Sequence, residues 1–596
     1  MNLSEQITQL LTKVIEKEFQ IKLTKINLEL YKGANFGHYS TSVCFELAKH
    51  MGKSPRDIGE IITNKIFENK QNELSFEKIE NINGFLNFYL SNEQIFSSLR
   101  YLIEKEKLGL GESFKNKKVI VEYTDPNPFK QFHMGHFMTN AIGESIYRLI
   151  LSQGADAHNL CYSGDVGIHV AKTIYGLLNK IENKEYSLED YLIFNNKKTI
   201  EQLGESYVLG STLYQSEVDK NQIQDLNNLI FTISQKYAEE LNIELSNNYN
   251  YSNKFDYKII EKIYDKGRIE SINYFKTIYN KLGSNFKELI YESATGEFGS
   301  KFVKESPIFQ ESEGAIIWDG KQFGKNVQVL INGRGNPTYS AKEIGLNLLK
   351  KIKYNPDISI ICTAREQEFY FKDLIEIFKQ LGFSQETIHL PHGELRNKSG
   401  KMSSRTGDIV TMDDIINQIK EEVIINFSSK KDQKFLESIS EQIAISSLKY
   451  LILKNSLGTN IIYDPKTVSD LTGNTGSYLL YTYARSVSVL NKAGVFSDFD
   501  IINLTDLELH PSEKELLIKG LMFNEVVSKA ALEYSPVILT TYLFDYAKVF
   551  NHFYNEVKIL EANSEIKDLR LFITLLSKEI LNKGLKLLAI NPLENL

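Results

Sequence analysis

The chain has 596 residues, of which 42% are hydrophobic and 24% are charged, a balance typical of globular proteins that excludes the disordered, collagen-like and fibrous classes. This length exceeds what one hydrophobic core can serve, so several domains are expected. The 69 basic and 76 acidic residues give a net charge of −7, which taken alone counts mildly against a nucleic-acid partner.

Residues 1–95 predict a small α+β domain. Residues 3–19 have the period of an amphipathic helix and lack the basic start and apolar stretch of a signal peptide, and no later apolar run approaches the ~18 residues of a membrane span. We therefore expect a cytoplasmic protein without a membrane partner. A second helical pattern covers 41–50, Ser54 and Pro55 mark the start of a third helix, and a strand follows a glycine turn.

Residues 110–411 predict a Rossmann-like domain. The apolar run 117–124 is typical of a buried parallel strand, and a polar loop leads from it to a helix whose apolar residues share one face. A strand, a tight loop and a helix in this order open a nucleotide-binding α/β fold. Further strands are predicted at 157–162, 327–331, 357–362 and 386–390. A helical stretch rich in Lys, Asn and Tyr, from about 175 to 290, is too long for a connection and predicts an inserted subdomain.

From residue 412 to residue 596 the pattern is almost wholly helical, without an internal repeat or a low-complexity tract. The three cysteines, Cys44, Cys161 and Cys362, lie far apart in the chain. Their spacing excludes a CxxC zinc knuckle and argues against a disulfide framework.

The first chemical motif is His133-Met134-Gly135-His136, at the predicted junction of strand and helix. Two imidazoles three residues apart at a helix start lie close together, beside the positive end of the helix dipole. There they can bind a triphosphate and stabilise charge on an attacked α-phosphate, and Gly135 leaves room for a nucleobase. For an isolated motif, two surface histidines that cap a helix are an equal alternative, whereas a zinc site lacks a third ligand nearby.

The second motif, residues 400–408, is a polar loop between two glycines that carries Lys401 and Arg405. Such a loop can bring cations onto a pyrophosphate leaving group, although alone it is more often a solvated turn. The two motifs together, HMGH followed by KMSSR, resemble the HIGH and KMSKS signatures of the class I aminoacyl-tRNA synthetases.

Several further segments make the chain resemble the arginyl-tRNA synthetase family. The loop DPNPFKQFHMGH is similar to that family's SPN…K…HxGH, and FGHYSTS is similar to its FGDYATN start. YSGDVG resembles its GDWG segment, and GNTGSYLLYTYAR resembles its GNTGPYLQYAHAR. ESEGAIIWDG, NPTYSAKEIGL and REQEFYF match later catalytic segments. The resemblance covers nearly the whole chain outside residues 180–280.

The resemblance implies a multidomain α/β protein with three parts. These are an α+β N-terminal domain that contacts the tRNA elbow, a Rossmann-like class I catalytic domain, and an all-α C-terminal domain that binds the anticodon from about residue 470 onward. It also implies an arginine–tRNA ligase used in translation. Such an enzyme converts L-arginine and ATP to arginyl-adenylate and pyrophosphate, and then transfers arginine to the 3′-terminal adenosine of tRNA(Arg).

The resemblance also implies the reaction's requirements. Activation needs bound tRNA, and ATP with Mg²⁺ enters as a substrate complex without a protein-bound metal or prosthetic group. The family default is a monomer.

Arginine binding is assigned by the resemblance to a set of polar positions: Glu122, Asp125, Asn127, His136, Tyr339, Glu343 and Gln367. A guanidinium needs planar, fork-like acceptors, which the carboxylates of Glu122 and Glu343 supply. This sequence departs from the family at two of these positions, where the family usually has Asp instead of Glu343 and Ser instead of Asp125. Both departures concern the finer geometry of the arginine pocket. The resemblance assigns ATP binding to a second set of residues: Pro126, Gly135, His133, His136, Lys401, Met402, Ser403 and Ser404.

Charge stabilisation in the activation step falls to five cationic or hydrogen-bonding residues: His133, His136, Lys130, Lys401 and Arg405. Ser404 stands where KMSKS has its second lysine, so one cation is missing from the loop. Both Lys130 and Arg405 are candidates to replace it.

For tRNA, Tyr478, Tyr481 and Arg485 share one face of a predicted helix, on which anticodon bases can stack. Packing inside the helical domain is an equal alternative for each tyrosine. Lysines in the insertion, the second motif and the C-terminal helices are further candidate contacts, so the net charge of −7 does not exclude tRNA.

Two other functions remain open. A smaller nucleotidylyltransferase of the same HxGH superfamily would adenylylate a metabolite without tRNA, but the N-terminal and C-terminal domains count against it. A non-catalytic RNA-binding or regulatory relative is disfavoured by the intact HMGH, Lys401 and arginine positions.

Overall fold

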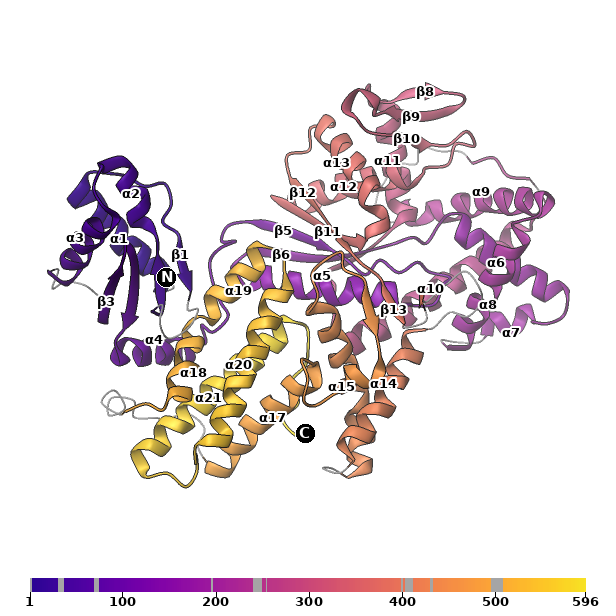
Figure 1. Cartoon of the computed structure of the whole chain (residues 1–596). Coiled ribbons are helices and arrows are strands. Elements are labelled where there is room, and N and C mark those ends of the chain that lie inside the picture. The colour runs from indigo at the N-terminus through magenta and orange to yellow at the C-terminus, as the bar shows by residue number, and fades with distance from the viewer. Residues whose placement is uncertain are drawn as a thin grey trace. The chain divides into compact units, whose positions relative to one another are not determined.

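The computed structural model describes residues 3–30, 37–68, 74–193, 197–239, 249–252, 254–397, 400–401, 411–428, 432–494 and 508–596. The chain divides into two compact units (Figure 1). Met1–Ser113, Ser152–Gly154 and Asp470–Leu596 form the first unit, and Phe114–Leu151 with Ala155–Ser469 form the second.

The N-terminal part of the first unit is an α+β domain. Its antiparallel sheet has the order β1-β2-β4-β3, from Leu28–Leu30, Tyr39–Thr41, Phe85–Leu90 and Phe76–Ile82. Its helices are α1 (Leu3–Phe19), α2 (Val43–Met51), α3 (Pro55–Glu68) and α4 (Asn92–Glu104). The predicted helices and the strand after the glycine turn are confirmed, and Ser54 Oγ accepts a hydrogen bond from the backbone of Asp57 at 3.1 Å at the start of α3.

The C-terminal part of the first unit is helical, as predicted. It contains α17 (Gly476–Ala493), α18 (Pro511–Leu521), α19 (Phe523–Leu532), α20 (Pro536–Glu556) and α21 (Ser564–Leu587). Apolar residues at helical spacing meet in its core, where Leu576, Leu543 and Ile580 are fully buried. This part joins the α+β domain through α4, because Phe96 of α4 packs on Phe572 of α21 with ring centroids 6.0 Å apart.

The second unit is built on a five-stranded parallel sheet of order β12-β11-β5-β6-β7. The strands are Glu386–His392, Ile358–Ala364, Lys118–Glu122, Asp156–Ser163 and Glu288–Tyr291. Its helices include α5 (Met134–Ser152), α11 (Glu292–Glu305), α12 (Tyr339–Lys353) and α13 (Glu368–Gln380). Buried Val, Ile and Cys side chains fill β5 and β11, as expected for parallel strands that are covered on both faces.

Strand formation at 327–331 is confirmed, but this strand belongs to another sheet. β10 (Val327–Ile331) pairs antiparallel with β9 (Ala315–Asp319), which pairs with β8 (Gln310–Ser312). β7 was not predicted from the sequence. It pairs with β6, so residues 288–291 lie in the main sheet, although the insertion was predicted to extend to about residue 290.

Between β6 and β7, the described residues form five helices that make a subdomain with its own core. They are α6 (Ile168–Glu182), α7 (Leu188–Ile193), α8 (Lys197–Leu213), α9 (Glu217–Glu239) and α10 (Tyr257–Leu282). Figure 1 shows them grouped at one end of the second unit. Fully buried Ile174, Leu229 and Ile263 belong to this core. We call residues 168–282 the inserted subdomain.

The second unit ends in helices α14 (Met412–Phe427), α15 (Gln433–Leu453) and α16 (Pro465–Val468). A small sheet of order β14-β13-β15 accompanies them, formed by Gly400–Lys401, Leu395–Asn397 and Ile461–Tyr463. Among the described residues, no helix is both long and apolar enough to cross a membrane.

Candidate active site

Two histidine rings stack at the start of α5, which follows β5 after a loop. The ring centroids of His133 and His136 are 3.7 Å apart, with 21° between their planes. His136 Nδ1 accepts a hydrogen bond from the backbone N–H of His133 at 3.2 Å, and His133 Nδ1 accepts one from the N–H of Gly135 at 3.1 Å. Because each Nδ1 is an acceptor, the proton of each neutral ring lies on Nε2. The pair therefore carries two Nε2–H donors.

Both rings of this pair are neutral at physiological pH. Burial, followed by the charge of Lys130, lowers the pKa of His133 to about 4. Burial lowers the pKa of His136 well below its usual value, and the charges of His133 and Lys130 add to this effect. The two histidines can therefore stabilise an anion by donating hydrogen bonds, without carrying a positive charge themselves.

Four carboxylates lie at the end of β5, in the loop after it, and in the first turns of α11 and α12. We call this set the acidic cluster: Glu122, Asp125, Glu292 and Glu343. Burial raises the pKa of Glu343 well above its usual value, and the charge of Glu122 adds to that rise. Burial and the charge of Glu122 likewise raise the pKa of Asp125. A bound cation would offset both effects and favour the ionised carboxylates.

Two buried lysines accompany the acidic cluster. Lys350 forms an ion pair with Glu122, and Lys342 Nζ lies 2.5 Å from a carboxylate oxygen of Glu292. Two ammonium groups against four carboxylates leave the cluster short of positive charge. The cluster is thus suited to a cationic ligand, such as a guanidinium.

The remaining predicted arginine-binding residues outside the histidine pair are Asn127, Tyr339 and Gln367. Asn127 Oδ1 accepts a hydrogen bond from the backbone of Gly164 at 3.1 Å, so its side chain bridges the loop before α5 to the end of β6. Tyr339 lies one helical turn before Glu343 at the start of α12, and 61% of it is exposed. Gln367 is exposed at the start of α13. The latter two side chains are therefore accessible from solvent.

Of the residues assigned to ATP, those near HMGH are well placed for a nucleotide. Pro126 is buried in the loop between β5 and α5, and Gly135 lies under the ring of His133. A Cβ at Gly135 would approach that ring to 3.0 Å, so glycine is what allows the ring to lie over the helix start. Lys401 follows Gly400 in β14, which pairs with β13.

Four residues of the second motif, Met402, Ser403, Ser404 and Arg405, lie outside the described residues, as does the side chain of Lys401. Beyond them the chain returns to the first motif, because Thr411 forms an antiparallel bridge with His133. Thr411 also caps α14, accepting a hydrogen bond from the backbone of Asp414 at 3.2 Å. The first described residue after the second motif is thus attached to HMGH.

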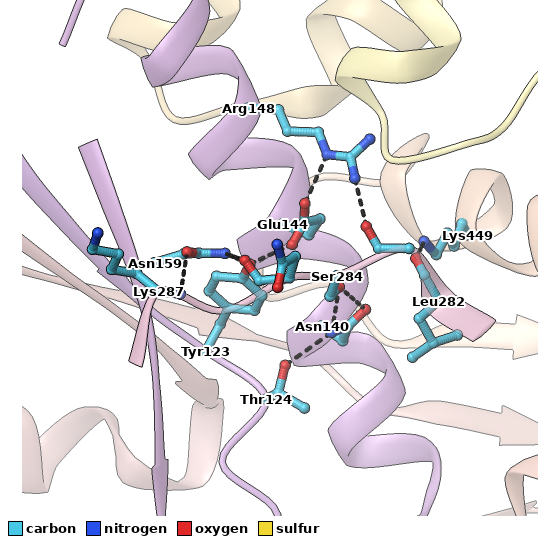
Figure 2. Close-up of polar contacts among 12 residues, drawn as sticks. Tyr123, Thr124, Asn140, Glu144, Arg148, Asn159, Leu282, Ser284, Lys287 and Lys449 are labelled. Atoms are coloured by element: carbon cyan, nitrogen blue, oxygen red, sulfur yellow. Dashed lines mark hydrogen bonds and ion pairs between the residues drawn. The ribbon is translucent and has the colours of Figure 1, made fainter. Parts of the chain in front are cut away.

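A polar network behind HMGH holds α5 in place (Figure 2). Glu144 accepts hydrogen bonds from Tyr123 of the β5 end and from Arg148 Nε, the latter at 2.7 Å. Arg148 also donates to the carbonyl of Gly283 at 2.7 Å, and Lys449 of α15 donates to the neighbouring carbonyl of Leu282 at 2.5 Å. The loop that ends the inserted subdomain is therefore bound from α5 and from α15.

Sequence reasoning missed several residues that shape the site. Lys350 lies seven residues after Glu343 on one face of α12, and that spacing was the available signal. Asp165 and Arg268 form a buried ion pair at 2.7 Å, and Asp165 also accepts a hydrogen bond from the backbone of Ser293 at 2.9 Å. The only signal for that pair was the position of Asp165 in the YSGDVG segment.

The predicted tRNA-binding residues form one cluster in the first unit. Asn551 of α20 donates to the Tyr478 hydroxyl at 2.9 Å and accepts from Arg485 at 2.5 Å. The Arg485 guanidinium lies 4.9 Å from the ring centroid of Tyr481 and 4.6 Å from that of Tyr554. All three predicted residues are partly exposed, so they combine contacts within the helical part with an accessible surface.

No group of three or more His, Cys, Asp or Glu arranged to hold a metal ion was found among the described residues. The comparisons with known proteins are consistent along the chain. The model named arginyl tRNA synthetase N terminal domain matches residues 1–90, the catalytic domain of tRNA synthetases class I (R) matches 99–464, and the DALR anticodon binding domain matches 479–596.

Relatives of similar length match the whole chain. The arginine–tRNA ligase of Clostridium acetobutylicum is 27% identical over 613 residues, which cover 100% of both chains. That of Flavobacterium psychrophilum is 27% identical and covers 97% of both. Among solved structures, the arginyl-tRNA synthetase of Thermus thermophilus has a TM-score of 0.76 at 20% identity, with 100% of both chains covered. That of Plasmodium falciparum has a TM-score of 0.74 at 20% identity, with 100% of this chain and 99% of the other covered.

Proposed function

The chain belongs to the arginyl-tRNA synthetase family of class I, and from this premise we propose which residues carry out its arginine–tRNA ligase reaction. The reaction joins arginine to tRNA for translation and uses ATP. The observation that supports the assignment best is the occurrence of the acidic cluster and the stacked histidines in the same unit. The cluster offers acceptors for a cationic side chain, and the histidine pair offers hydrogen-bond donors for a phosphate.

Glu343 and Glu122 bind the substrate guanidinium in this proposal. Glu343 faces a cluster that is short of positive charge, and an arginine side chain would supply the missing cation. Glu122 is shared with Lys350, so its carboxylate contacts one resident ammonium and one substrate group. Tyr339 lines the accessible side, while Asn127 and Gln367 bind the amine and carboxylate of the substrate.

The activation step takes place over the start of α5. The arginine carboxylate attacks the α-phosphate of ATP in line, and pyrophosphate leaves. The Nε2–H groups of His133 and His136 donate to the phosphate oxygens as charge develops there. Lys130, Lys401 and Arg405 supply positive charge, and Mg²⁺ accompanies ATP as part of the substrate. No covalent intermediate with the protein is required.

The transfer step uses the tRNA held by both units. The 3′-terminal adenosine hydroxyl attacks the carbonyl of the adenylate, and AMP leaves. Tyr478, Tyr481 and Arg485 bind the anticodon region, and the α+β domain binds the tRNA elbow. We further propose that the enzyme is a cytoplasmic monomer and that activation awaits bound tRNA.

Charging of tRNA tests this proposal directly. The purified chain is incubated with ATP, Mg²⁺, labelled arginine and a tRNA with an arginine anticodon, and acid-precipitable label is measured. We expect charging with arginine and none with citrulline, because citrulline leaves the buried acidic acceptors without a cation. Adenylylation of a small metabolite without any charging would favour the nucleotidylyltransferase alternative.

A further inference from the structure

A lysine of the HMGH loop lies on an aromatic ring of the inserted subdomain. The Nζ atom of Lys130 is 4.5 Å from the ring centroid of Tyr207, which belongs to α8. An ammonium at this distance over a ring is attracted to the negative face of its π-system. Lys130 lies three residues before His133, and its charge adds to the lowering of the pKa of His133 and His136 that burial causes, so the ammonium acts electrostatically on the histidine pair.

Close packing one turn earlier on α8 supports the contact between Lys130 and Tyr207. A Cβ placed at Gly204 would approach the side chain of Gln131 to 3.3 Å, so α8 packs closely against the residue that follows Lys130. Gly204 and Tyr207 are three residues apart and share a helix face. This face of α8 therefore covers the loop that leads to HMGH.

The position of α8 is fixed by close helix packing. A Cβ at Gly210 of α8 would lie 1.9 Å from the carbonyl oxygen of Lys172, and one at Gly176 of α6 would lie 2.1 Å from that of Ser206. Only glycine permits such an approach of the two helix backbones. Since α6 begins directly after the end of β6, the Tyr207 ring is held at a set place relative to the sheet.

Lys130 needs such support for geometric reasons. A lysine side chain has a flexible four-carbon stem, and a loose ammonium would sample many positions around the phosphates. If the ammonium is held in one place before the reaction, the entropic cost of ordering it no longer adds to the activation barrier in full. Tyr207 holds the ammonium through its ring and through a hydrogen bond to its hydroxyl, which leaves the other N–H groups of the ammonium available.

We propose that Tyr207 is a positioning residue that holds the Lys130 ammonium beside the histidine pair, so that the inserted subdomain takes part in arginine activation. The inference rests on the proposed function, because the role of Lys130 in activation belongs to that proposal. The pKa of the Tyr207 phenol agrees with the contact. Burial raises it, but the charge and hydrogen bond of Lys130 bring it below its usual value.

Variants of Tyr207 in the full-length chain test the proposal by ATP–pyrophosphate exchange with saturating tRNA. We expect Tyr207→Leu to lower kcat roughly 3- to 10-fold, the range that a partly exposed cation–π contact supplies, with the KM for arginine nearly unchanged. Tyr207→Phe keeps the ring and should keep most of the rate. Equal losses in both variants would overturn the role of the ring.

Tyr214, the residue directly after α8, provides a matched control. Its ring lies 4.1 Å from Nζ of Lys172, and it packs against the core of the inserted subdomain. Tyr214→Leu removes a contact of the same kind away from the HMGH loop. We expect the exchange rate of Tyr214→Leu to match that of the wild type. A loss as large as that of Tyr207→Leu would show that the Tyr207 effect comes from a general disturbance of α8.

A double-variant cycle separates this inference from the proposed function. If Tyr207 acts through Lys130, Tyr207→Leu should cause no further loss in a Lys130→Ala background. A further loss of the same size there would overturn the inference while leaving the role of Lys130 intact. Unimpaired exchange in Lys130→Ala alone would instead refute the proposed role of Lys130.

Discussion

The ammonium of Lys350 and the carboxylate of Glu122 form an ion pair inside the second unit, where each side chain is 2% exposed. Lys350 lies on α12 and Glu122 at the end of β5, so the pair joins helix and sheet next to the candidate arginine pocket. Glu122 therefore already has a cationic partner, Lys350. Glu343 is left as the main carboxylate for a substrate guanidinium.

Replacing Glu343 by glutamine should weaken arginine binding strongly. The substrate guanidinium would lose a buried, charged partner, an effect of about 2–5 kcal/mol that corresponds to a rise in the arginine KM of roughly 30-fold or more. The KM for ATP should stay close to the wild-type value. Steady-state exchange kinetics of Glu343→Gln measure both. Glu366→Gln, an exposed acid near the start of α13, is the control, and unchanged arginine kinetics in Glu343→Gln would remove Glu343 from the site.

Removing Lys350 alone should destabilise the second unit. Lys350→Met leaves the Glu122 carboxylate buried without its cation, which costs about 3–5 kcal/mol of unfolding free energy. The double variant Glu122→Gln/Lys350→Met should recover most of that loss, because no unpaired charge remains. Denaturant unfolding of the wild type and the two variants measures this. A double variant as unstable as Lys350→Met would show that the pair does not act as a unit.

Alanine variants show whether Lys130 or Arg405 replaces the missing lysine of the second motif. We expect Lys130→Ala to slow ATP–pyrophosphate exchange by about 10²-fold, the loss typical of a group that stabilises developing charge, because its ammonium acts electrostatically on His133 and His136. Arg405→Ala should have the smaller effect. A loss of exchange rate in Arg405→Ala alone would reverse this assignment. If neither variant slows exchange, neither residue replaces the missing lysine.

His38 of the α+β domain should make the first unit sensitive to acid. Its Nδ1 accepts a hydrogen bond from the backbone of Leu90 at 3.0 Å, and burial, then the charge of Lys514, lowers its pKa to about 4. The folded pKa lies below the unfolded value of about 6.5, so this stabilisation is present above that pH and is lost as the pH falls toward 4.

The variant His38→Asn keeps an acceptor for Leu90 without a titrating ring. Between pH values of about 7.5 and 5.5, the wild type should lose about 1 kcal/mol more unfolding free energy than this variant. Urea unfolding at both pH values provides the measurement. Equal losses would mean that His38 titrates normally in the folded chain.

The parts of the fold that were predicted from sequence are those with a local signal. The apolar run of β5, the periodic face of α5 and the two histidines between them follow from residue spacing alone, and the structure places them as expected. β7 was missed because its four residues, Glu288–Tyr291, are too few to show a period.

The unpredicted parts of the site depend on contacts between distant segments. Glu122 and Lys350 meet only because α12 packs on the sheet, and Lys130 meets Tyr207 only because α8 folds over the HMGH loop. The Lys130–Tyr207 pairing leaves no mark on the spacing of nearby residues, and the only local signal for Lys350 is its seven-residue spacing from Glu343 on α12. Each lysine also resembles an ordinary surface cation in a chain where 69 residues are basic.

The most direct test of the central claim is ATP–pyrophosphate exchange by the wild-type chain with arginine, measured with and without tRNA. Our account predicts exchange with arginine only when tRNA(Arg) is present, and none when citrulline replaces arginine. Exchange without tRNA would contradict the tRNA requirement. The absence of exchange under every condition would contradict the catalytic role of the histidine pair and the acidic cluster.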